Sequence, residues 1–136
     1  MTDWSKVSAL RWNCFEKGCH NIKCRPKLLA LAGSLPGRIA FSDIDATVEV
    51  GGRFLFLEWK SPGARVSIGQ EIYHKKLTAL SPRITSVIVE GDPASMEVSS
   101  VRVIRGGKWG VREPASLQSL SARIQRWSSA AKARAA

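Results

Sequence analysis

Two aspartates and a Glu-x-Lys sequence surround a pair of glycines in residues 43–60, which read DIDATVEVGGRFLFLEWK. Aspartate, glutamate and lysine can bind metal ions, transfer protons and stabilise developing negative charge. Asp43 and Asp45 are two residues apart, and so are Glu58 and Lys60. Side chains two apart on a β-strand point to the same face. If two strands pair across the glycines, the spacing therefore predicts that these four side chains share one face.

The element that would bring them together is a β-hairpin turning at Gly51-Gly52. The residues on both sides alternate between apolar and polar types, and the tightest hairpin turns need positive φ at both central positions. Glycine adopts that φ without steric cost. If the residues flanking the glycines pair, Asp45 lies directly opposite Glu58. Asp43 then lies opposite Lys60.

Two carboxylates in such a pair would have Cβ atoms about 4.5–5.5 Å apart and would repel each other unless a cation lay between them. Mg²⁺ or Mn²⁺ is the expected ion, because a hard divalent ion is held by one or two carboxylates together with water and phosphate oxygens. Asp45 and Glu58 are thus the predicted metal ligands, with Asp43 as a further candidate. Lys60 would stabilise charge on a phosphate or orient the attacking water.

A solvated hairpin edge is the alternative explanation for these charges. Against it, the second strand has an apolar face formed by Leu55, Leu57 and Trp59, and phenylalanines interleave with the charges on the other face. A strand buried on both faces rarely contains charged residues without a functional reason.

A helix is predicted from Ser67 to about Leu80, before Pro82. Ser67 and Gln70 have the spacing of a capping box. The Gln70 side chain could serve that cap or reach the charged cluster, and the sequence leaves both open. His74, one turn further along, could approach the charged cluster, but exposure to solvent is the favoured interpretation.

These residues together resemble the PD-(D/E)xK nuclease superfamily, and most of all its VRR-NUC and phage Holliday-junction-resolvase-like branches. The shared features are an aspartate, a hairpin, Glu-x-Lys and a helical glutamine, over about residues 38–90. The resemblance implies that Asp45 and Glu58 bind the catalytic metal. It also implies that Lys60 assists the water and that Gln70 lies beside the site.

The resemblance implies an α/β (α+β) fold with a restriction-endonuclease-like αβββαβ core over about residues 26–90, in which helices flank a central mixed sheet. Ser42 stands where the motif has proline. The two aspartates leave the metal ligand ambiguous, and the register favours Asp45 over Asp43. In similar nucleases an acid on the first helix contributes to a metal site, which makes Glu16 a candidate, although a surface glutamate explains it as well.

The other predicted elements surround this core within a single domain, residues 1–136. They are a basic helix over 3–18, a helix from Pro26 to Ala32, strands Arg38–Val50 and Arg53–Lys60, a strand Ile84–Val89, an extra hairpin of Val98–Arg105 and Lys108–Arg112 with an exposed Arg102, and a C-terminal helix from Ser116 with a frayed tail after Ser128. On that last helix, an apolar stripe is either core or a dimer contact; it contains Leu117, Leu120, Ile124 and Trp127.

The chain of 136 residues has 21 Lys and Arg against 11 Asp and Glu, a formal net charge of +10. Basic residues exceed acids in residues 1–38 and 105–136, whereas the two are nearly balanced between these segments. Such flanks favour a nucleic-acid partner, most simply DNA, although a solvated basic surface is the alternative. The residues predicted to contact nucleic acid are Arg65, Lys75, Lys76, Arg105, Lys108, Arg112, Arg123 and Arg126.

Cys14, Cys19 and Cys24 recur every five residues, with His20 beside the second. This spacing allows a structural Zn²⁺ site. Adjacent Cys19 and His20 can hardly bind one ion together, so free, reduced cysteines are the favoured interpretation.

No stretch approaches the roughly 18 apolar residues of a membrane span, and the N-terminal residues lack the apolar run of a signal peptide. We therefore expect an intracellular, cytoplasmic protein without a membrane partner, and the resemblance implies a bacterial or phage-infected host cell.

The sequence thus predicts a Mg²⁺- or Mn²⁺-dependent endonuclease that hydrolyses phosphodiester bonds in DNA. Its small size favours recognition of branched, flapped or junction DNA, and resolving a four-way junction would require two sites and hence a homodimer. The alternatives are a non-catalytic nucleic-acid-binding or phage-type inhibitor protein that keeps the nuclease fold, and a small zinc-organised interaction module.

Overall fold

The computed structural model describes residues 28–42 and 44–135. The chain divides into two compact units, residues 1–42 and 43–136. In the first unit, Leu28–Ser34 form a 3₁₀ helix, η3, where the sequence predicts a helix two residues earlier. The predicted helix over 3–18 lies outside the described residues. The expectation of one domain concerns how the two units pack together, and it stays a prediction.

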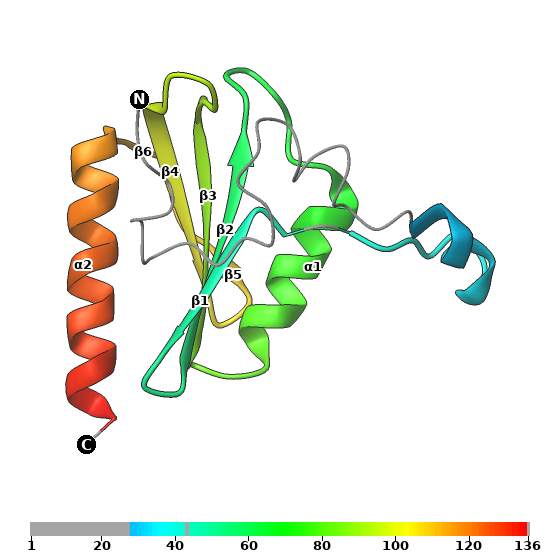
Figure 1. Ribbon diagram of the computed structural model, residues 1–136, viewed down its shortest axis with the longest axis horizontal. Helices are drawn as coiled ribbons and strands as arrows, with labels where there is room; N and C mark the ends of the chain where they lie inside the picture. Colours follow the sequence, from blue (N-terminus) through cyan, green and yellow to red (C-terminus); the bar gives the residue numbers. More distant parts are fainter. Residues whose placement is uncertain (1–27, 43, 136) are drawn as a thin grey trace, which may run out of the picture. The chain divides into compact units, whose positions relative to one another are not determined.

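The second unit has an α+β fold, with a mixed six-stranded sheet and two α-helices in its described part (Figure 1). The strands follow the order β1-β2-β3-β4-β5, and β6 also pairs with β4. All pairs are antiparallel except β2 with β3, which α1 connects. The elements are β1 (Ala46–Val50), β2 (Arg53–Lys60), α1 (Ile68–Ala79), β3 (Ile84–Asp92), β4 (Glu97–Arg105), β5 (Lys108–Trp109), β6 (Glu113–Pro114) and α2 (Leu117–Arg134).

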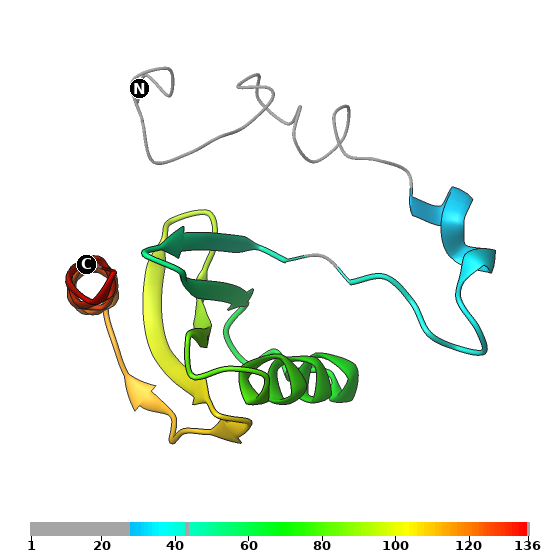
Figure 2. The ribbon, with the colours of Figure 1, turned by 90° about the horizontal axis from the view of Figure 1, so that it is seen from below.

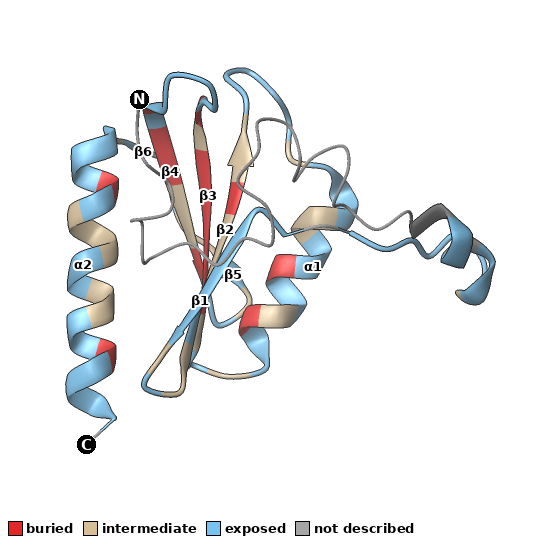
Figure 3. Ribbon diagram, in the orientation of Figure 1, coloured by how far each residue is buried: buried red, intermediate tan, exposed pale blue. Residues whose placement is uncertain are grey.

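The two α-helices lie against opposite faces of the sheet (Figure 2). The apolar core lies between the sheet and α2, and buried positions concentrate in the central strands (Figure 3). On the other face, side chains of β2 and β3 contact α1 through hydrogen bonds. The buried core consists of Leu55, Val87, Val89, Val98, Val101 and Leu120.

The hairpin of β1 and β2 has the predicted register, because Val50 pairs with Arg53 and Ala46 with Leu57. Its turn has φ of +57° and +78° at the two glycines. The prediction that the first strand starts at Arg38 is wrong, since β1 begins only at Ala46.

The end of β2 explains this difference. At Ser61 the chain leaves the sheet and turns, and the N–H of Ala64 donates to the Ser61 carbonyl at 3.0 Å. Residues 38–42 would lie opposite positions beyond Lys60 and would have no strand beside them, and unpaired backbone groups do not sustain a strand.

The predicted frayed tail after Ser128 is also wrong, because α2 continues to Arg134 and Ala131 is only 1% exposed. The helix end packs on the turn between β1 and β2. A Cβ atom at Gly51 would lie 2.6 Å from the Ala131 carbonyl oxygen. Glycine thus serves the turn and the close approach of α2 together.

The apolar stripe of α2 belongs largely to the core, which is one of the two alternatives predicted from the sequence. Leu120 is buried, and Ile124 and Trp127 pack against the same core. Leu117 is 40% exposed. No helix in the described part of the chain is long and apolar enough to cross a membrane.

The pairing of β3 with β4 shifts by one residue between Glu90 and Gly91, so that Ser99 forms a β-bulge. Because of the bulge, Val98 and Val101 both join the core although they are three residues apart. The second hairpin is shorter than predicted: β5 ends at Trp109.

Candidate active site

Glu58 is a buried carboxylate, with 6% of its surface exposed, on the face of β2 that α1 covers. Gln70 Nε2 donates to Glu58 Oε1 at 2.8 Å, and Lys60 Nζ donates to Gln70 Oε1 at 2.5 Å. Lys60 Nζ also lies 3.7 Å from Glu58 Oε1. The three side chains thus form a closed network between the end of β2 and the start of α1.

The start of α1 positions Gln70. Ser67 is the N-cap, and its hydroxyl accepts the Gln70 backbone N–H at 3.2 Å. The Gln70 side chain makes its hydrogen bonds with Glu58 and Lys60. Of the two alternatives left open by the sequence, the backbone of Gln70 therefore serves the cap, and its side chain joins the charged cluster.

His74 follows Gln70 on α1 by about one helical turn. It is 2% exposed, so the expectation of a solvent-facing histidine is wrong. Residues four apart share one face of a helix, and the face that directs Gln70 toward the sheet directs His74 there too. Its Nε2 lies 3.8 Å from Glu58 Oε2, and its Nδ1 is hydrogen bonded to the Ser86 hydroxyl at 2.9 Å.

Burial lowers the pKa of His74, and the positive charge of Lys60 lowers it further. At neutral pH the residue beside Glu58 is thus a neutral imidazole, which can exchange hydrogen bonds but adds no positive charge. Among the described residues, Lys60 is the cation that lies next to the Glu58 carboxylate.

Asp45 is exposed and directly precedes β1. Its Oδ2 accepts the backbone N–H of Trp59 at 2.6 Å. This bond fixes Asp45 against β2 beside Glu58. The other predicted aspartate, Asp43, lies outside the described residues.

Within the described residues, no group of three or more His, Cys, Asp or Glu side chains is arranged to hold a metal ion. A magnesium site does not need such a group of three, because the ion can be held by one or two carboxylates together with water. Two carboxylates are present here, Asp45 and Glu58. The remaining predicted ligands, Glu16, Cys14, Cys19 and Cys24, lie outside the described part of the chain.

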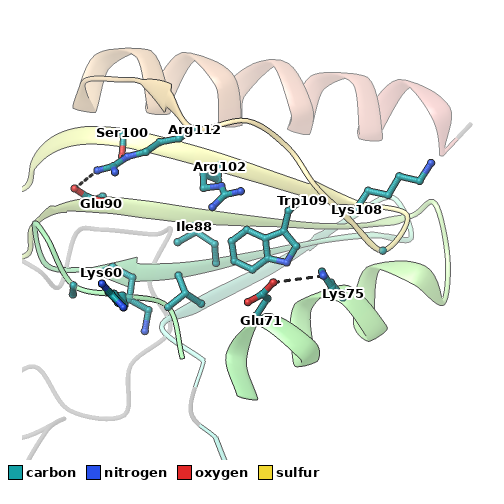
Figure 4. A pocket seen from close by; sticks show the side chains of 14 residues that line it. Lys60, Glu71, Lys75, Ile88, Glu90, Ser100, Arg102, Lys108, Trp109 and Arg112 are labelled. Atoms are coloured by element: carbon teal, nitrogen blue, oxygen red, sulfur yellow. Dashed lines mark hydrogen bonds and ion pairs between the residues drawn. The ribbon is translucent and has the colours of Figure 1, made fainter. Parts of the chain in front are cut away.

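A cleft of about 640 Å³ opens next to Lys60. Figure 4 shows side chains of β2, β3, β4, β5 and α1 pointing into it. Two of its basic residues are paired: Lys75 lies 3.5 Å from Glu71, and Arg112 forms a salt bridge with Glu90. The cleft is also lined by basic residues beyond these pairs, namely Lys60, Arg65, Arg102 and Lys108.

Arg102 is half-buried, and not exposed as predicted. Its guanidinium lies 4.7 Å from the centroid of the Trp109 ring and donates to the Gly110 carbonyl at 3.2 Å. Sequence reasoning missed Trp109 and Glu90 as parts of the cleft. The parallel register, which pairs Lys60 with Glu90, brings the latter there, and no local pattern indicates that pairing.

The residues predicted to contact nucleic acid fall into three groups. Arg65, Lys75, Lys108 and Arg112 line the cleft. Lys76 is exposed and lines neither this cleft nor a second depression. That depression, on the α2 side, is lined by Arg105, Arg123 and Arg126 together with further arginines.

Comparisons with known proteins identify no relative: no protein-family model, curated protein or solved structure matches this chain. The case for its function therefore comes from the geometry of the Glu58 cluster and the cleft beside it.

Proposed function

We propose that the Glu58 cluster is the active site of a divalent-metal-dependent DNA endonuclease of the PD-(D/E)xK type. One observation carries the proposal. A buried carboxylate, Glu58, is bridged by Gln70 to Lys60, and Lys60 lines a cleft rich in basic residues. The pattern combines a ligand for a hard cation, a cation for phosphate charge and a binding surface for a polyanion.

The cost of this cluster supports a role in chemistry. Taking a carboxylate and an ammonium out of water costs several kcal/mol per ion, and well-packed apolar residues are often as stable as a buried ion pair. Nothing in the packing of β2 requires a charge at Glu58, because the opposite face of the same strand supplies core residues. Buried ionisable groups beside a cleft are characteristic of functional sites.

The topology supports the same assignment. Lys60 ends β2 and pairs with Glu90, near the end of the parallel strand β3 that α1 connects to it, and in open sheets ligands bind at the carboxyl ends of such strands. A hairpin, a crossover helix and a parallel strand are the central part of the αβββαβ core. The proposal therefore includes the assignment of a restriction-endonuclease-like core to this protein.

The donor set fits a Mg²⁺ or Mn²⁺ ion held by Asp45 and Glu58, since both are carboxylates and they lie directly beyond the last pair of the hairpin, Ala46 with Leu57, on their two strands. When bound, the ion would polarise the scissile phosphate and lower the pKa of the attacking water.

The protein groups have separate tasks. Lys60 stabilises the negative charge that develops on the phosphate, and Gln70 holds Lys60 and Glu58 in position. Arg65 and Lys108 contact phosphates that flank the scissile one. Recognition of DNA structure over sequence is part of this proposal, and cutting both strands of a junction would require a homodimer.

The test is cleavage of linear, flapped and four-way DNA in the presence of Mg²⁺ or Mn²⁺. We expect Glu58→Ala and Lys60→Ala each to lower the rate by about 10²–10³-fold or more, the effect of removing one group that stabilises a transition state. Glu97→Ala and Lys132→Ala are matched controls, because they remove the same charges from exposed positions.

Cleavage that survives both active-site substitutions would eliminate this site. A wild-type protein that binds DNA tightly but does not cut it with either ion would instead support the non-catalytic nucleic-acid-binding alternative.

A further inference from the structure

A second strongly charged surface lies on the α2 side of the sheet, at the end of the strands remote from Lys60. It is a groove of about 460 Å³ whose lining contains six arginines and no acidic residue. We call it the arginine groove. Its arginines are Arg53, Arg83, Arg105, Arg123, Arg126 and Arg134.

Three elements build the groove. Arg53 begins β2, Arg83 directly precedes β3, and Arg105 ends β4. Because β4 runs antiparallel to β3, these three positions meet at one end of the sheet. The other three arginines come from α2, so the groove runs along the line where the helix packs on the sheet.

The charge of the groove is mostly uncompensated. Arg123 donates to Glu113 at 2.5 Å. Among the described residues, none of the other five arginines has a salt bridge to a carboxylate. Gathering like charges opposes the compact state, and a bound polyanion would offset this repulsion.

We propose that the arginine groove binds the phosphates of a nucleic-acid backbone, at a site separate from the Glu58 cleft. Guanidinium groups bind phosphate oxygens in bidentate geometry, which lysine cannot do, and all the basic residues of the groove are arginines. This inference concerns binding and does not require that the Glu58 cluster be catalytic.

The dimensions favour an extended chain of phosphates over a single small anion. From Arg123 to Arg134 the helix rises roughly 16 Å at 1.5 Å per residue. One strand of a DNA duplex presents on the order of five phosphates over that length, at 3.4 Å each. A nucleotide could occupy only part of it.

The groove offers little to read a base sequence. Trp127 lines it but also packs against the apolar core, and Thr85 is buried. The other lining residues are proline and alanines. Binding should therefore depend on backbone charge and be nearly independent of sequence.

The groove and the cleft are too far apart for one phosphate to serve both. Arg53 and Lys60 are the first and last residues of β2, roughly 23 Å apart at 3.3 Å per residue. Their side chains also point to opposite faces of the sheet, because side chains alternate between the two faces along a strand and one residue number is odd and the other even. The two surfaces would thus hold different parts of a long nucleic acid.

The test compares two double variants that each remove two positive charges. Arg126→Ala/Arg134→Ala, the groove variant, removes two exposed arginines of the groove, whereas Arg38→Ala/Lys132→Ala, the control variant, removes two exposed basic residues that line neither depression. Binding of labelled duplex and single-stranded DNA of several sequences is followed by fluorescence anisotropy without divalent metal, over a range of salt concentrations.

We expect the groove variant to bind about tenfold or more weakly at low salt, with a slope of log K against log salt that is smaller by about two. The control variant should bind nearly as the wild type does. A third variant, Arg126→Lys/Arg134→Lys, should keep the salt slope but lose affinity, because it keeps charge and loses bidentate geometry.

Equal losses of affinity in the groove variant and the control variant would overturn the proposal, since net charge alone would then explain binding. So would unchanged binding of the groove variant, with its fold verified by circular dichroism. Glu58→Gln separates this proposal from the nuclease. If the wild-type protein binds DNA through the groove but does not cut it with either ion, only the nuclease proposal fails. If the wild-type protein cuts DNA and the groove variant binds DNA as tightly as the wild type, only the groove proposal fails.

Discussion

The two faces of the sheet use burial for different purposes. On the α2 face, valines and leucines form the apolar core. On the α1 face, the buried side chains include Glu58, His74, Thr78, Ser86 and Ser100. The contrast is clearest along β2, where Leu55 and Glu58 are 3% and 6% exposed.

This difference teaches that burial alone does not identify a core. Apolar burial on one face can stabilise the fold by roughly 25 cal/mol per Å². That stability leaves the other face able to hold groups that are costly to bury but useful for chemistry. Changes on the α2 face should therefore affect stability, and changes on the α1 face should affect activity.

The largest expected effect comes from the core. Leu120→Ala should lower the free energy of unfolding by about 2–5 kcal/mol, because it removes a buried side chain and leaves a cavity. Glu58→Gln keeps the size of the side chain, and the Lys60 ammonium that it leaves behind lines an open cleft, so we expect a smaller loss than for Leu120→Ala. Denaturant unfolding measures both. A Glu58→Gln variant as unstable as Leu120→Ala would break the comparison of the two faces.

The contact of α2 with the hairpin turn offers a second test. Gly51 and Gly106 have nearly equal φ, +57° and +58°, but only at Gly51 would an added Cβ meet another element, at the end of α2. Substitution by alanine costs about 1–2 kcal/mol at either left-handed position, and we expect about 1–3 kcal/mol more at Gly51 from the clash. Thermal unfolding of the two variants checks this. Equal losses would mean that α2 does not constrain the turn.

The two contributions of Gln70 can be separated by a third pair of variants. Gln70→Ala removes the bridge between Glu58 and Lys60, and we expect it to lower DNA cleavage about 10–100-fold, the usual effect of losing a residue that orients a ligand. Ser67→Ala removes only the cap and should cost about 1 kcal/mol of stability with cleavage nearly unchanged. The opposite pattern would assign Gln70 to the helix cap alone.

The smallest effect concerns pH. Burial, and then Lys60, lower the pKa of His74 below its ordinary value of 6.5. Between these two pKa values the unfolded chain binds a proton that the folded protein does not, so stability falls as the pH drops through this window. A single group contributes at most about 1.4 kcal/mol per pH unit there, and nothing above the window.

Unfolding of wild type and His74→Gln at a series of pH values tests this assignment. The variant should lose part of the acid sensitivity below pH 6.5. If both proteins respond equally to acid, His74 titrates normally and the α1 face is more open to water than its burial indicates.

The local chemistry of a few residues made part of the site predictable. Gly51-Gly52 determine the turn and therefore the register that brings Asp45 beside β2. Ser67 marks the start of α1, and the helical period then places Gln70 toward the sheet. These signals depend on residues close in sequence.

The features that could not be predicted depend on distant contacts. The burial of His74 arises from the packing of α1 on β3, and the length of α2 from its contact with Gly51. Glu90 enters the cleft only because β2 and β3 are parallel and in one particular register. Neither polarity nor propensity within a short window encodes these relations.

The bulge at Ser99 acts as a change of phase within one strand. After the bulge, the even-numbered residues Ser100, Arg102 and Ile104 lie on the face of β4 that borders the cleft. Before the bulge, the even-numbered Val98 lies in the core on the other face. Deleting Ser99 would restore a uniform phase and turn Val98 away from the core. A single inserted residue therefore lets β4 supply apolar side chains to one layer along its whole length while its later half also furnishes a polar wall for the other.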